Sequence, residues 1–384
     1  MSRVYVSHNN IISSLGFSSE EVVQAIHDGR SGVTKIDDKS LLKTPFFGSL
    51  IDSKLIGQHA ENNSLSEEYT RLEQLMILSL KKVIDASKIA LDDRVGVIIS
   101  STKGNIDALD ANVPLSNHRA YLGTLSDRIQ KHFGFTQEPI ILSNACVSGL
   151  LALVIAKRYI TAGLYDHVFV VGGDLVTSFI LSGFNSFQAM SNDRCKPYDK
   201  NRTGINIGEA VATALVTNSD NDLTAEAVEI VGDGSRNDAN HISGPSRTGE
   251  GLVRSIRSAM KEADMSVNDI DYISAHGTAT VFNDEMEAVA LNRLGLENIP
   301  VNSLKGYFGH TLGASGLIES IIGMHSLRNN TLYRSLGYNE QGTTSSIAVI
   351  EKVQPKQLTT FLKTASGFGG CNTAALFRKV KTNQ

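Results

Sequence analysis

The sequence predicts an α/β protein made of two halves of similar size. Segments rich in β-branched residues, typical of buried strands, recur along all 384 residues. Helix-like stretches lie between several of them, and this alternation favours buried sheets covered by helices. A chain of this length is long for one hydrophobic core, so we expect two halves of roughly 190 residues each.

The expected elements follow in chain order. Strands are predicted at residues 4–6, 95–100, 139–142, 168–172, 212–217, 227–231, 272–275, 347–350, 361–365 and 374–377. Helices are predicted at residues 66–87, 148–162 and 251–263. Residues 37–65 are irregular and carry no assignment. The clearest polar break is TNSDNDLT at residues 217–224, a little past the middle of the chain.

Composition and charge exclude several classes of protein. The formal net charge is −4 and no block of Lys and Arg occurs, so nucleic-acid binding is not expected. The N-terminus lacks a signal-peptide pattern, and the longest apolar run is far shorter than the ~20 residues that cross a bilayer. Three cysteines make no disulfide framework. We therefore expect a cytoplasmic protein without a membrane span.

The most informative segment is EPIILSNACVSGLLALVIAKRYI, which starts at Glu138. A short apolar strand leads into Cys146, and an apolar stretch typical of a buried helix follows. At such a strand-to-helix turn, unpaired N–H groups and the helix dipole would favour a thiolate and lower the thiol pKa. A buried core cysteine fits the same pattern. Cys195 lies in a polar loop and predicts nothing, whereas Cys371, beside a Gly-rich turn, is a candidate for a second catalytic thiol.

Two of the ten histidines stand in unusual surroundings. His276 follows the predicted strand 272–275 in SAHGTAT, where sites on α/β sheets tend to lie. His310 lies among glycines in NSLKGYFGHTLGASG, which permit close approach of backbone or ligand. Each histidine alone fits a structural role, but with Cys146 they fit nucleophilic chemistry. A metal site is not expected, because no HxxxH pair occurs and a coordinated thiol would be unavailable as a nucleophile.

Six motifs in order carry a resemblance to a known family. They are NACVSG, VGGD, KPYDKNRTG, AHGTATVFNDEMEA, LKGYFGHTLGASGLIES and GFGGCN, and they span nearly the whole chain with the N-terminal segment SSLGFSSEEVVQAIHDGRSGV. At these residues the chain resembles the elongating β-ketoacyl-acyl-carrier-protein synthases of the thiolase-like superfamily. The resemblance implies a decarboxylating condensation that lengthens an acyl chain by two carbons.

The resemblance also implies roles for the reacting residues. Cys146 would carry the acyl chain as a thioester, with its own N–H and that of Phe368 as the oxyanion hole. Malonyl thioester would lose CO2 between His276 and His310, which must act as neutral donors. The resulting carbanion would then attack the acyl carbonyl. No cofactor and no metal are needed for this chemistry.

Further residues match supporting positions of the family. Lys305 would pair with Glu319 and Asp284 and hold the His310 loop, since a lone buried Lys is costly. Glu287 is expected to support the site as well. Thr278 and Thr280 match positions that bond the pantetheine arm. Phe368 matches a gate between the acyl pocket and the malonyl site; a core aromatic in a Gly-rich turn is the alternative.

The fold implied by the resemblance has two similar halves in five layers, α-β-α-β-α. Residues 1–220 would carry the nucleophile, and residues 221–384 the two histidines. Such enzymes form homodimers, and a chain without a fused carrier domain implies a separate acyl carrier protein, loaded with acyl and malonyl groups.

The chain departs from the family pattern near the gate and the acyl pocket. The loop before Lys196 is short, GINIGEAVA replaces a GFVxGEG-like segment, and TASGFGG replaces NSFGFGG. Chain-length preference therefore does not carry over. Ordinary fatty acid elongation and a dedicated polyene or polyketide-like pathway both stay open, and these changes lean towards the dedicated pathway. Glu67 and Glu68 stand where relatives carry basic docking residues, with only Arg71 close by, which leaves the carrier docking patch open.

Two alternatives from other classes remain. A non-catalytic chain-length partner of another synthase would resemble the family but typically lacks the nucleophile. A thiolase would pair one Cys and one His with a second catalytic Cys, and Cys371 lies near the right end of the chain for that. The set of one cysteine and two histidines favours decarboxylating condensation over both.

Overall fold

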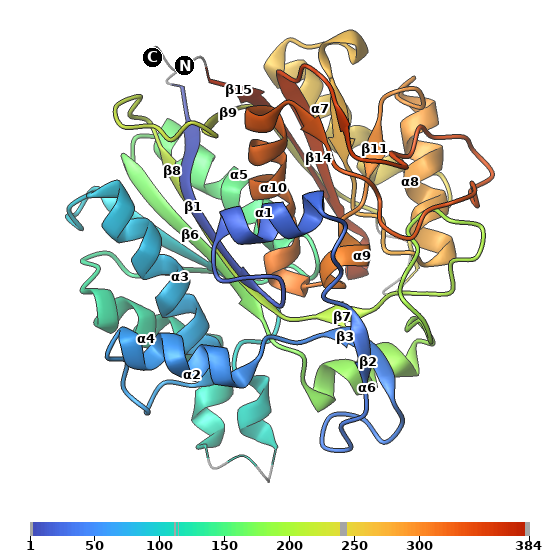
Figure 1. The fold of residues 1–384 in the computed structure, drawn as a ribbon. Coiled ribbons are helices and arrows are strands. Elements are labelled where there is room, and N and C mark those ends of the chain that lie inside the picture. Colours follow the sequence, from blue (N-terminus) through green and yellow to red (C-terminus); the bar gives the residue numbers. More distant parts are fainter. Residues whose placement is uncertain (1–2, 111–112, 114, 239–243, 381–384) are drawn as a thin grey trace.

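A single sheet of ten strands forms the centre of the protein. The computed structural model describes residues 3–110, 113, 115–238 and 244–380. The strands lie in the order β11-β10-β14-β15-β9-β1-β8-β6-β4-β5 (Figure 1). They are β1 (Tyr5–Ser13), β4 (Val95–Ser100), β5 (Ile140–Leu142), β6 (His167–Asp174), β8 (Ala210–Thr217), β9 (Val228–Asn237), β10 (Tyr272–Ser274), β11 (Val301–Asn302), β14 (Thr360–Ser366) and β15 (Cys371–Lys379).

The sheet contains the same five-strand arrangement twice. Outward from the middle, one set runs β1-β8-β6-β4-β5 and the other runs β9-β15-β14-β10-β11. In each set the first two neighbouring pairs are antiparallel and the next two are parallel. Among the described strands, the two sets pair with each other only through β1 and β9, at Tyr5↔Glu229 and Val6↔Val228. The chain thus carries a structural repeat that its residues did not reveal.

Helices cover both faces of each set and form five layers with the strands. In Figure 1, α3 and α4 flank the first set on one side, α7 and α8 flank the second set on the other, and α5 and α10 lie between. The thiolase-like fold expected from the resemblance is therefore confirmed. The bounds are α3 (Arg71–Ser87), α4 (Leu122–Phe133), α5 (Ser148–Thr161), α7 (Glu250–Ala263), α8 (Val281–Arg293) and α10 (Ser315–Asn329).

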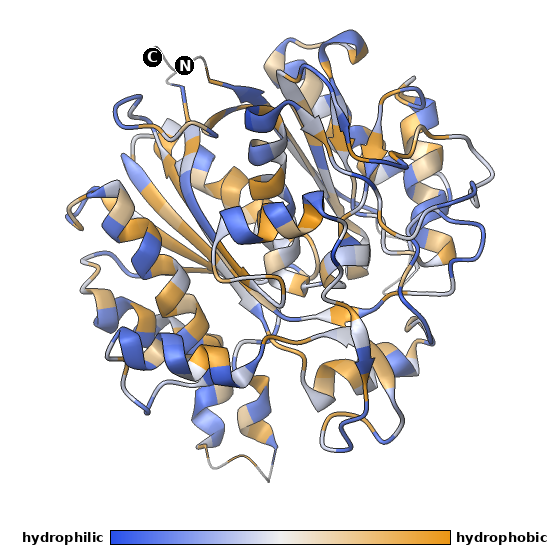
Figure 2. Cartoon of the chain, in the orientation of Figure 1, coloured by the Kyte–Doolittle hydropathy of each residue, from blue (hydrophilic) through white to orange (hydrophobic). Residues whose placement is uncertain are grey.

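The inner layer is the most apolar part of the protein. Both α5 and α10 lie in one large core cluster with residues from the two strand sets, and Figure 2 shows hydrophobic residues concentrated in the central strands and helices. The two helices begin in direct backbone contact: a Cβ added at Gly149 would lie 2.7 Å from the Gly313 oxygen, and one at Gly316 would lie 2.7 Å from the Leu150 nitrogen. Glycine is thus required on both sides of this contact.

Most predicted elements are present, with shifted ends. The helix predicted from residue 66 begins at Arg71, because Thr70 and Glu73 form a capping box that fixes the first turn there. The strand predicted at 347–350 is wrong, since this segment makes only an isolated bridge, Val301↔Val349. Residues 37–65 include a short strand and a helix, β3 (Phe46–Ser49) and α2 (Ser53–Asn62).

The remaining elements are short or peripheral. They are α1 (Ser19–His27), β2 (Thr34–Ile36), α6 (Ser178–Ser186), β7 (Ile207–Gly208), α9 (Lys305–Phe308), β12 (Thr331–Leu332) and β13 (Gln354–Pro355), with 3-10 turns at Ile106–Leu109, Asn117–Ala120, Val267–Asp269, Leu312–Ala314 and Phe368–Gly370. Among the described helices, none combines the length and the apolar composition that crossing a bilayer requires. The cytoplasmic location stays a prediction.

Candidate active site

Cys146 lies in the turn between β5 and α5, as the sequence predicts. Ala145 precedes it with a φ of 44°, a left-handed backbone conformation that residues other than glycine rarely adopt. The Ser148 hydroxyl secures the turn, because it donates to the Ala145 oxygen at 2.6 Å and accepts from the Asn144 nitrogen at 2.7 Å. The thiol is therefore held rigidly just before a buried helix.

The thiol pKa differs from the sequence-based expectation. Burial, together with the neighbouring Cys371, raises the pKa of Cys146 to about 12, while Lys305 and the Phe368 backbone N–H lower it only in part. The expected lowering at a helix N-terminus is therefore wrong for this site. The cost of placing a charge in an apolar enclosure outweighs the nearby positive groups. The raised pKa favours the neutral thiol over the thiolate.

His276 follows β10, where the strand leaves the sheet. The Glu287 carboxylate accepts hydrogen bonds from the backbone N–H groups of His276 at 2.9 Å and Gly277 at 2.6 Å. The Ser303 hydroxyl donates to the Gly277 oxygen at 2.7 Å. The backbone on both sides of the imidazole is thus fixed by buried groups.

His310 follows α9 and precedes α10. Its backbone N–H donates to the Asn206 oxygen at 2.7 Å, and its oxygen accepts from the Gly208 nitrogen at 3.0 Å. Gly309 before it has a φ of 69°, and a Cβ there would lie 2.9 Å from the Asn206 oxygen. Close backbone packing therefore sets the position of the ring.

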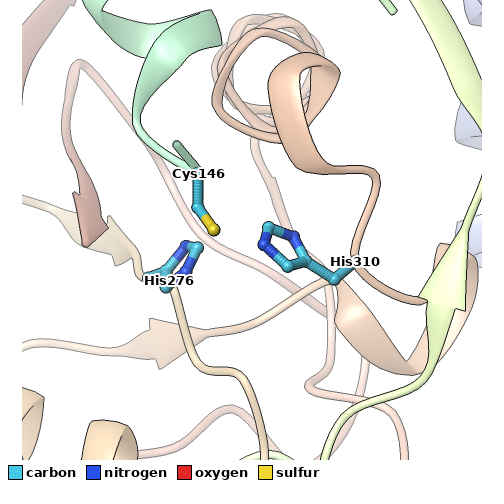
Figure 3. A group of neighbouring side chains, drawn as sticks. All are labelled: Cys146, His276 and His310. Atoms are coloured by element: carbon cyan, nitrogen blue, oxygen red, sulfur yellow. The ribbon is translucent and has the colours of Figure 1, made fainter. Parts of the chain in front are cut away.

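The fold brings the three residues together. Figure 3 shows the Cys146 thiol pointing into the space between the two imidazoles. One ligand atom from each of Cys146, His276 and His310 lies within 4.8 Å of the others, and all three residues are buried. The rings are perpendicular, with centroids 5.2 Å apart. Cys146 comes from the first strand set and both histidines come from the second.

Both imidazoles are neutral, and several of their ring nitrogens have no hydrogen-bond partner among the described residues. Burial is the main cause that lowers the pKa of His276 and His310 well below the ordinary 6.5, and Lys305 lowers both further. Both ring nitrogens of His310 and Nδ1 of His276 are buried without a hydrogen-bond partner among the described residues. A buried polar group without a partner costs ~1–3 kcal/mol. Each neutral ring carries one N–H, so one nitrogen of each ring can donate to a ligand oxygen.

A charged cluster lies behind the histidines. Lys305 is fully buried, donates to the Ser315 hydroxyl at 2.9 Å and bonds to Glu319. Lys363 is also fully buried and pairs with the second Glu319 oxygen at 2.9 Å. Burial alone would raise the pKa of Glu319, but the two ammonium groups outweigh it and hold the pKa below its usual value. The predicted Lys305–Glu319 pair is present; Lys363 was not predicted.

Asp284 does not serve Lys305. Its carboxylate accepts from the Tyr198 nitrogen at 2.7 Å and the Ala279 nitrogen at 3.1 Å, and it faces Arg202 at 3.8 Å. The expected Lys305–Asp284 pair is wrong, because Glu319 occupies the space around the ammonium. Asp284 instead fixes the loop that follows His276.

A cavity of about 420 Å³ opens onto Cys146 and both histidines. Thr278, Thr280 and Phe368 line it, and the two threonine hydroxyls are hydrogen bonded to each other at 2.8 Å. Phe368 stacks on Phe184 with centroids 5.6 Å apart and meets the edge of Phe187 at 5.4 Å. The two aromatic partners on and beside α6 were not predicted from the sequence.

The other two cysteines are buried. Cys195 bonds to the Lys305 oxygen at 3.3 Å, so the loop that looked incidental packs behind the His310 segment. Cys371 lies beside the Cys146 turn, with its sulfur 3.3 Å from the Phe368 oxygen. Burial raises the pKa of Cys371 to about 11, which does not favour a second thiolate.

The geometry removes one argument against a metal. The distance between Cys146, His276 and His310 along the sequence is no argument against a metal, because the fold brings the three side chains together. Zinc binds sets of one thiolate and two imidazoles. The same atoms serve nucleophilic catalysis, where a coordinated sulfur could not attack. A site without metal stays a prediction.

The segment at the start of α3, where relatives carry basic docking residues, presents little unpaired positive charge at the surface. Glu67 and Glu68 are exposed. Arg71 is engaged inside the protein, since it pairs with Glu209 and donates to the Ser53 hydroxyl at 2.8 Å. The docking patch cannot be assigned to this segment by charge.

Comparisons with known proteins agree with the fold. The β-ketoacyl synthase N-terminal domain family matches residues 2–221, and the C-terminal domain family matches residues 227–339. The 3-oxoacyl-acyl-carrier-protein synthase 2 of Vibrio harveyi is 27% identical, with 98% of this chain and 99% of the relative aligned. The 3-oxoacyl-acyl-carrier-protein synthase 1 of Escherichia coli K12 is 26% identical, with 99% of this chain and 100% of the relative aligned.

Solved structures share the fold. The ketosynthase ApeO, in complex with its chain length factor ApeC from Xenorhabdus doucetiae, matches with a TM-score of 0.86 and 24% identity, over 99% of this chain and 98% of that one. The architecture and the family matches define an acyltransferase of the condensing class. The chain belongs to the β-ketoacyl synthase family.

Proposed function

We propose that the chain is an active elongating synthase that condenses a Cys146-bound acyl group with malonyl-acyl carrier protein. One observation carries this proposal: two buried, neutral imidazoles with unpartnered ring nitrogens lie beside a buried thiol, with one ligand atom of each residue within 4.8 Å of the others. A protein without decarboxylation chemistry gains nothing from these unsatisfied groups. A malonyl thioester oxygen that accepts from both rings would satisfy them.

The first step is acyl transfer to Cys146. The sulfur attacks the thioester carbonyl of the acyl carrier protein, and the carrier thiol leaves with the proton. The backbone N–H groups of Cys146 and Phe368 stabilise the tetrahedral oxyanion, a contribution of ~3–4 kcal/mol for one well-placed donor. The Phe368 N–H already points at the sulfur. Phe368 acts as the gate, held by Phe184 and Phe187.

The second step is decarboxylation and condensation. Malonyl thioester binds between His276 and His310, and its C–CO2 bond breaks to leave an enolate whose oxygen the two rings stabilise. The carbanion forms a bond to the acyl carbonyl carbon while the C–S bond to Cys146 breaks. The sulfur then regains a proton. Thr278 and Thr280 bind the pantetheine arm at the cavity wall.

The assembly follows from the same proposal. We infer a homodimer and a separate acyl carrier protein loaded with acyl or malonyl groups. We place the division between the halves at residues 220 and 221, in the segment that joins β8 to β9. The altered residues beside the gate support a dedicated pathway for polyene or polyketide-like chains over ordinary fatty acid elongation.

Intact-protein mass spectrometry tests the proposal. The protein is incubated with a panel of acyl carrier proteins and malonyl carrier protein, and adduct and product masses are recorded. A gain of one acyl group and a β-keto product two carbons longer are expected, and the accepted chains indicate the pathway. No adduct and no product with any carrier would overturn it and favour a non-catalytic chain-length partner, whose second synthase chain would then be sought.

A further inference from the structure

We propose that Lys363 is a positioning residue that links the two histidine segments through Glu319, an inference that rests on the proposed function. Lys363 lies in the middle of β14, a strand in which every residue is buried. Its ammonium touches no part of the cavity wall. Its effect must therefore act through other residues.

The ammonium of Lys363 holds the segment that leads into His276. It donates to the oxygens of Ser274 at 3.0 Å and Ala275 at 3.3 Å, the last two residues before the histidine. It also donates to the Thr364 oxygen at 2.5 Å. These bonds fix the end of β10 through its carbonyl oxygens, while Glu287 fixes the following backbone through the N–H groups of His276 and Gly277.

Glu319 extends the link to His310. One carboxylate oxygen faces Lys363 at 2.9 Å and the other bonds to Lys305. Lys305 starts α9, and its oxygen accepts from the Gly309 nitrogen at 2.8 Å, directly before His310. A continuous chain of buried charges therefore runs from the backbone before one imidazole to the backbone before the other.

The burial of these charges is hard to explain by stability. Buried ion pairs are often no more stabilising than well-packed apolar residues of similar volume, because desolvation offsets the attraction. The apolar neighbours of Lys363 on β14 show that the strand could have been completed with an apolar side chain. The charges instead fix the spacing between the imidazoles of His276 and His310, which must both donate to the oxygen of the malonyl thioester.

The two half-reactions separate this role from simple folding. Lys363→Gln keeps hydrogen-bond donors without charge, and Lys363→Met removes both. Because a misplacement of ~1 Å can cost ~100-fold in rate, decarboxylation of malonyl-carrier protein should fall ~10- to 100-fold in Lys363→Met and less in Lys363→Gln. Acylation of Cys146 does not use the histidines and should stay within about threefold of wild type.

Leu362→Ala is the matched control. Leu362 is the adjacent buried residue of β14 and packs in a core cluster on the opposite face of the strand, and it does not line the cavity. It should lower the midpoint of thermal unfolding while both half-reactions fall together. Equal losses of acylation and decarboxylation in folded Lys363→Gln, as in this control, would overturn the positioning role.

The outcome is distinct from failure of the proposed function. If Lys363→Met does not fold, Lys363→Gln alone decides between the two results. If wild-type protein neither takes up an acyl group nor releases CO2, the proposed function itself fails. If wild type does both and the variants lose both equally, only the assignment of Lys363 is wrong.

Discussion

Cys146 and His310 occupy the same place in the two strand sets. Cys146 follows β5, the outermost strand of the first set, and precedes the inner helix α5; His310 follows β11, the outermost strand of the second, and precedes the inner helix α10. The surroundings differ. Backbone packing holds both turns, but Ser148 completes the Cys146 turn, whereas the buried charges of Lys305 and Glu319 back the His310 turn.

Under the proposed function, the difference follows from what each turn must do. A nucleophile needs access and an oxyanion hole, and a neutral thiol is compatible with an apolar enclosure. Two donors that share one oxygen need a fixed spacing, which hydrogen-bonded charges impose more strictly than packing. Acyl transfer should therefore depend on the first turn and decarboxylation on the second, so the two half-reactions can be separated by substitution.

Cys146→Ala has the largest expected effect, because it removes the nucleophile. No covalent acyl adduct should form and condensation should fall below detection, whereas malonyl decarboxylation should continue. Intact mass and CO2 release measure the two. Cys371→Ala, which changes the neighbouring buried thiol, is the matched control and should keep the adduct. An acyl adduct that persists on Cys146→Ala would disprove the assignment.

His310→Ala tests the other turn. Loss of one preorganised donor should slow decarboxylation by ~10²–10³-fold, while acylation of Cys146 stays near the wild-type rate. His325→Ala removes a buried imidazole of α10, the helix that follows His310, and controls for lost packing, because His325 contacts Asn9 rather than the site. Decarboxylation at the normal rate in His310→Ala would refute the role of this residue.

Phe368→Ala should have an intermediate effect, on selection rather than on chemistry. Opening the gate should change the ratio of rates for short and long acyl chains ~10-fold, while decarboxylation changes less than about twofold. Competing acyl carriers and product masses measure this ratio. Phe179, exposed on α6 and absent from the cavity wall, provides the control Phe179→Ala. Equal changes in both readouts would argue against a gate.

The smallest effect is expected from pH. Burial and nearby cations lower both imidazole pKa values well below 6.5, so protonation, which removes the neutral ring, begins only below that pH. Decarboxylation should therefore stay constant from about pH 8 down to about 6.5 and fall only in more acidic buffer. The Cys146→Ala protein is the proper sample, since it carries no nucleophilic thiol. An acid limb centred near 6.5 would contradict neutral, buried rings.

The sequence predicted the reacting residues because their signals are local. A cysteine between an apolar strand and an apolar helix, and histidines beside glycines at strand ends, mark turns that a buried sheet exposes to ligand. The family resemblance then supplied their roles, which remain to be tested. The thiol pKa was predicted in the wrong direction, because the argument counted the helix dipole and left out desolvation.

The features that were missed depend on contacts between distant segments. Lys363 reads as a lone charge in an apolar strand, and only its contact with Glu319 gives it a partner. Asp284 was assigned to Lys305, but Arg202 and the Tyr198 backbone take its carboxylate. Helix α10 was not assigned because it is buried on nearly all sides and therefore lacks an amphipathic period. The strand expected at 347–350 has suitable residues but almost no pairing partner.

The glycine contact between α5 and α10 has a consequence for protein engineering. Because Gly149 and Gly316 let the two backbones touch, the separation between sulfur and imidazole is set by main-chain packing rather than by the residues lining the cavity. Libraries that randomise Phe187 and Phe368 can therefore alter which acyl chains enter, whereas Phe184 meets the His310 ring edge-on, with centroids 6.5 Å apart, and should be kept. Replacing Gly149 or Gly316 would push the two helices apart and move the reacting atoms. Turnover would fall, although the residues that line the cavity would be unchanged.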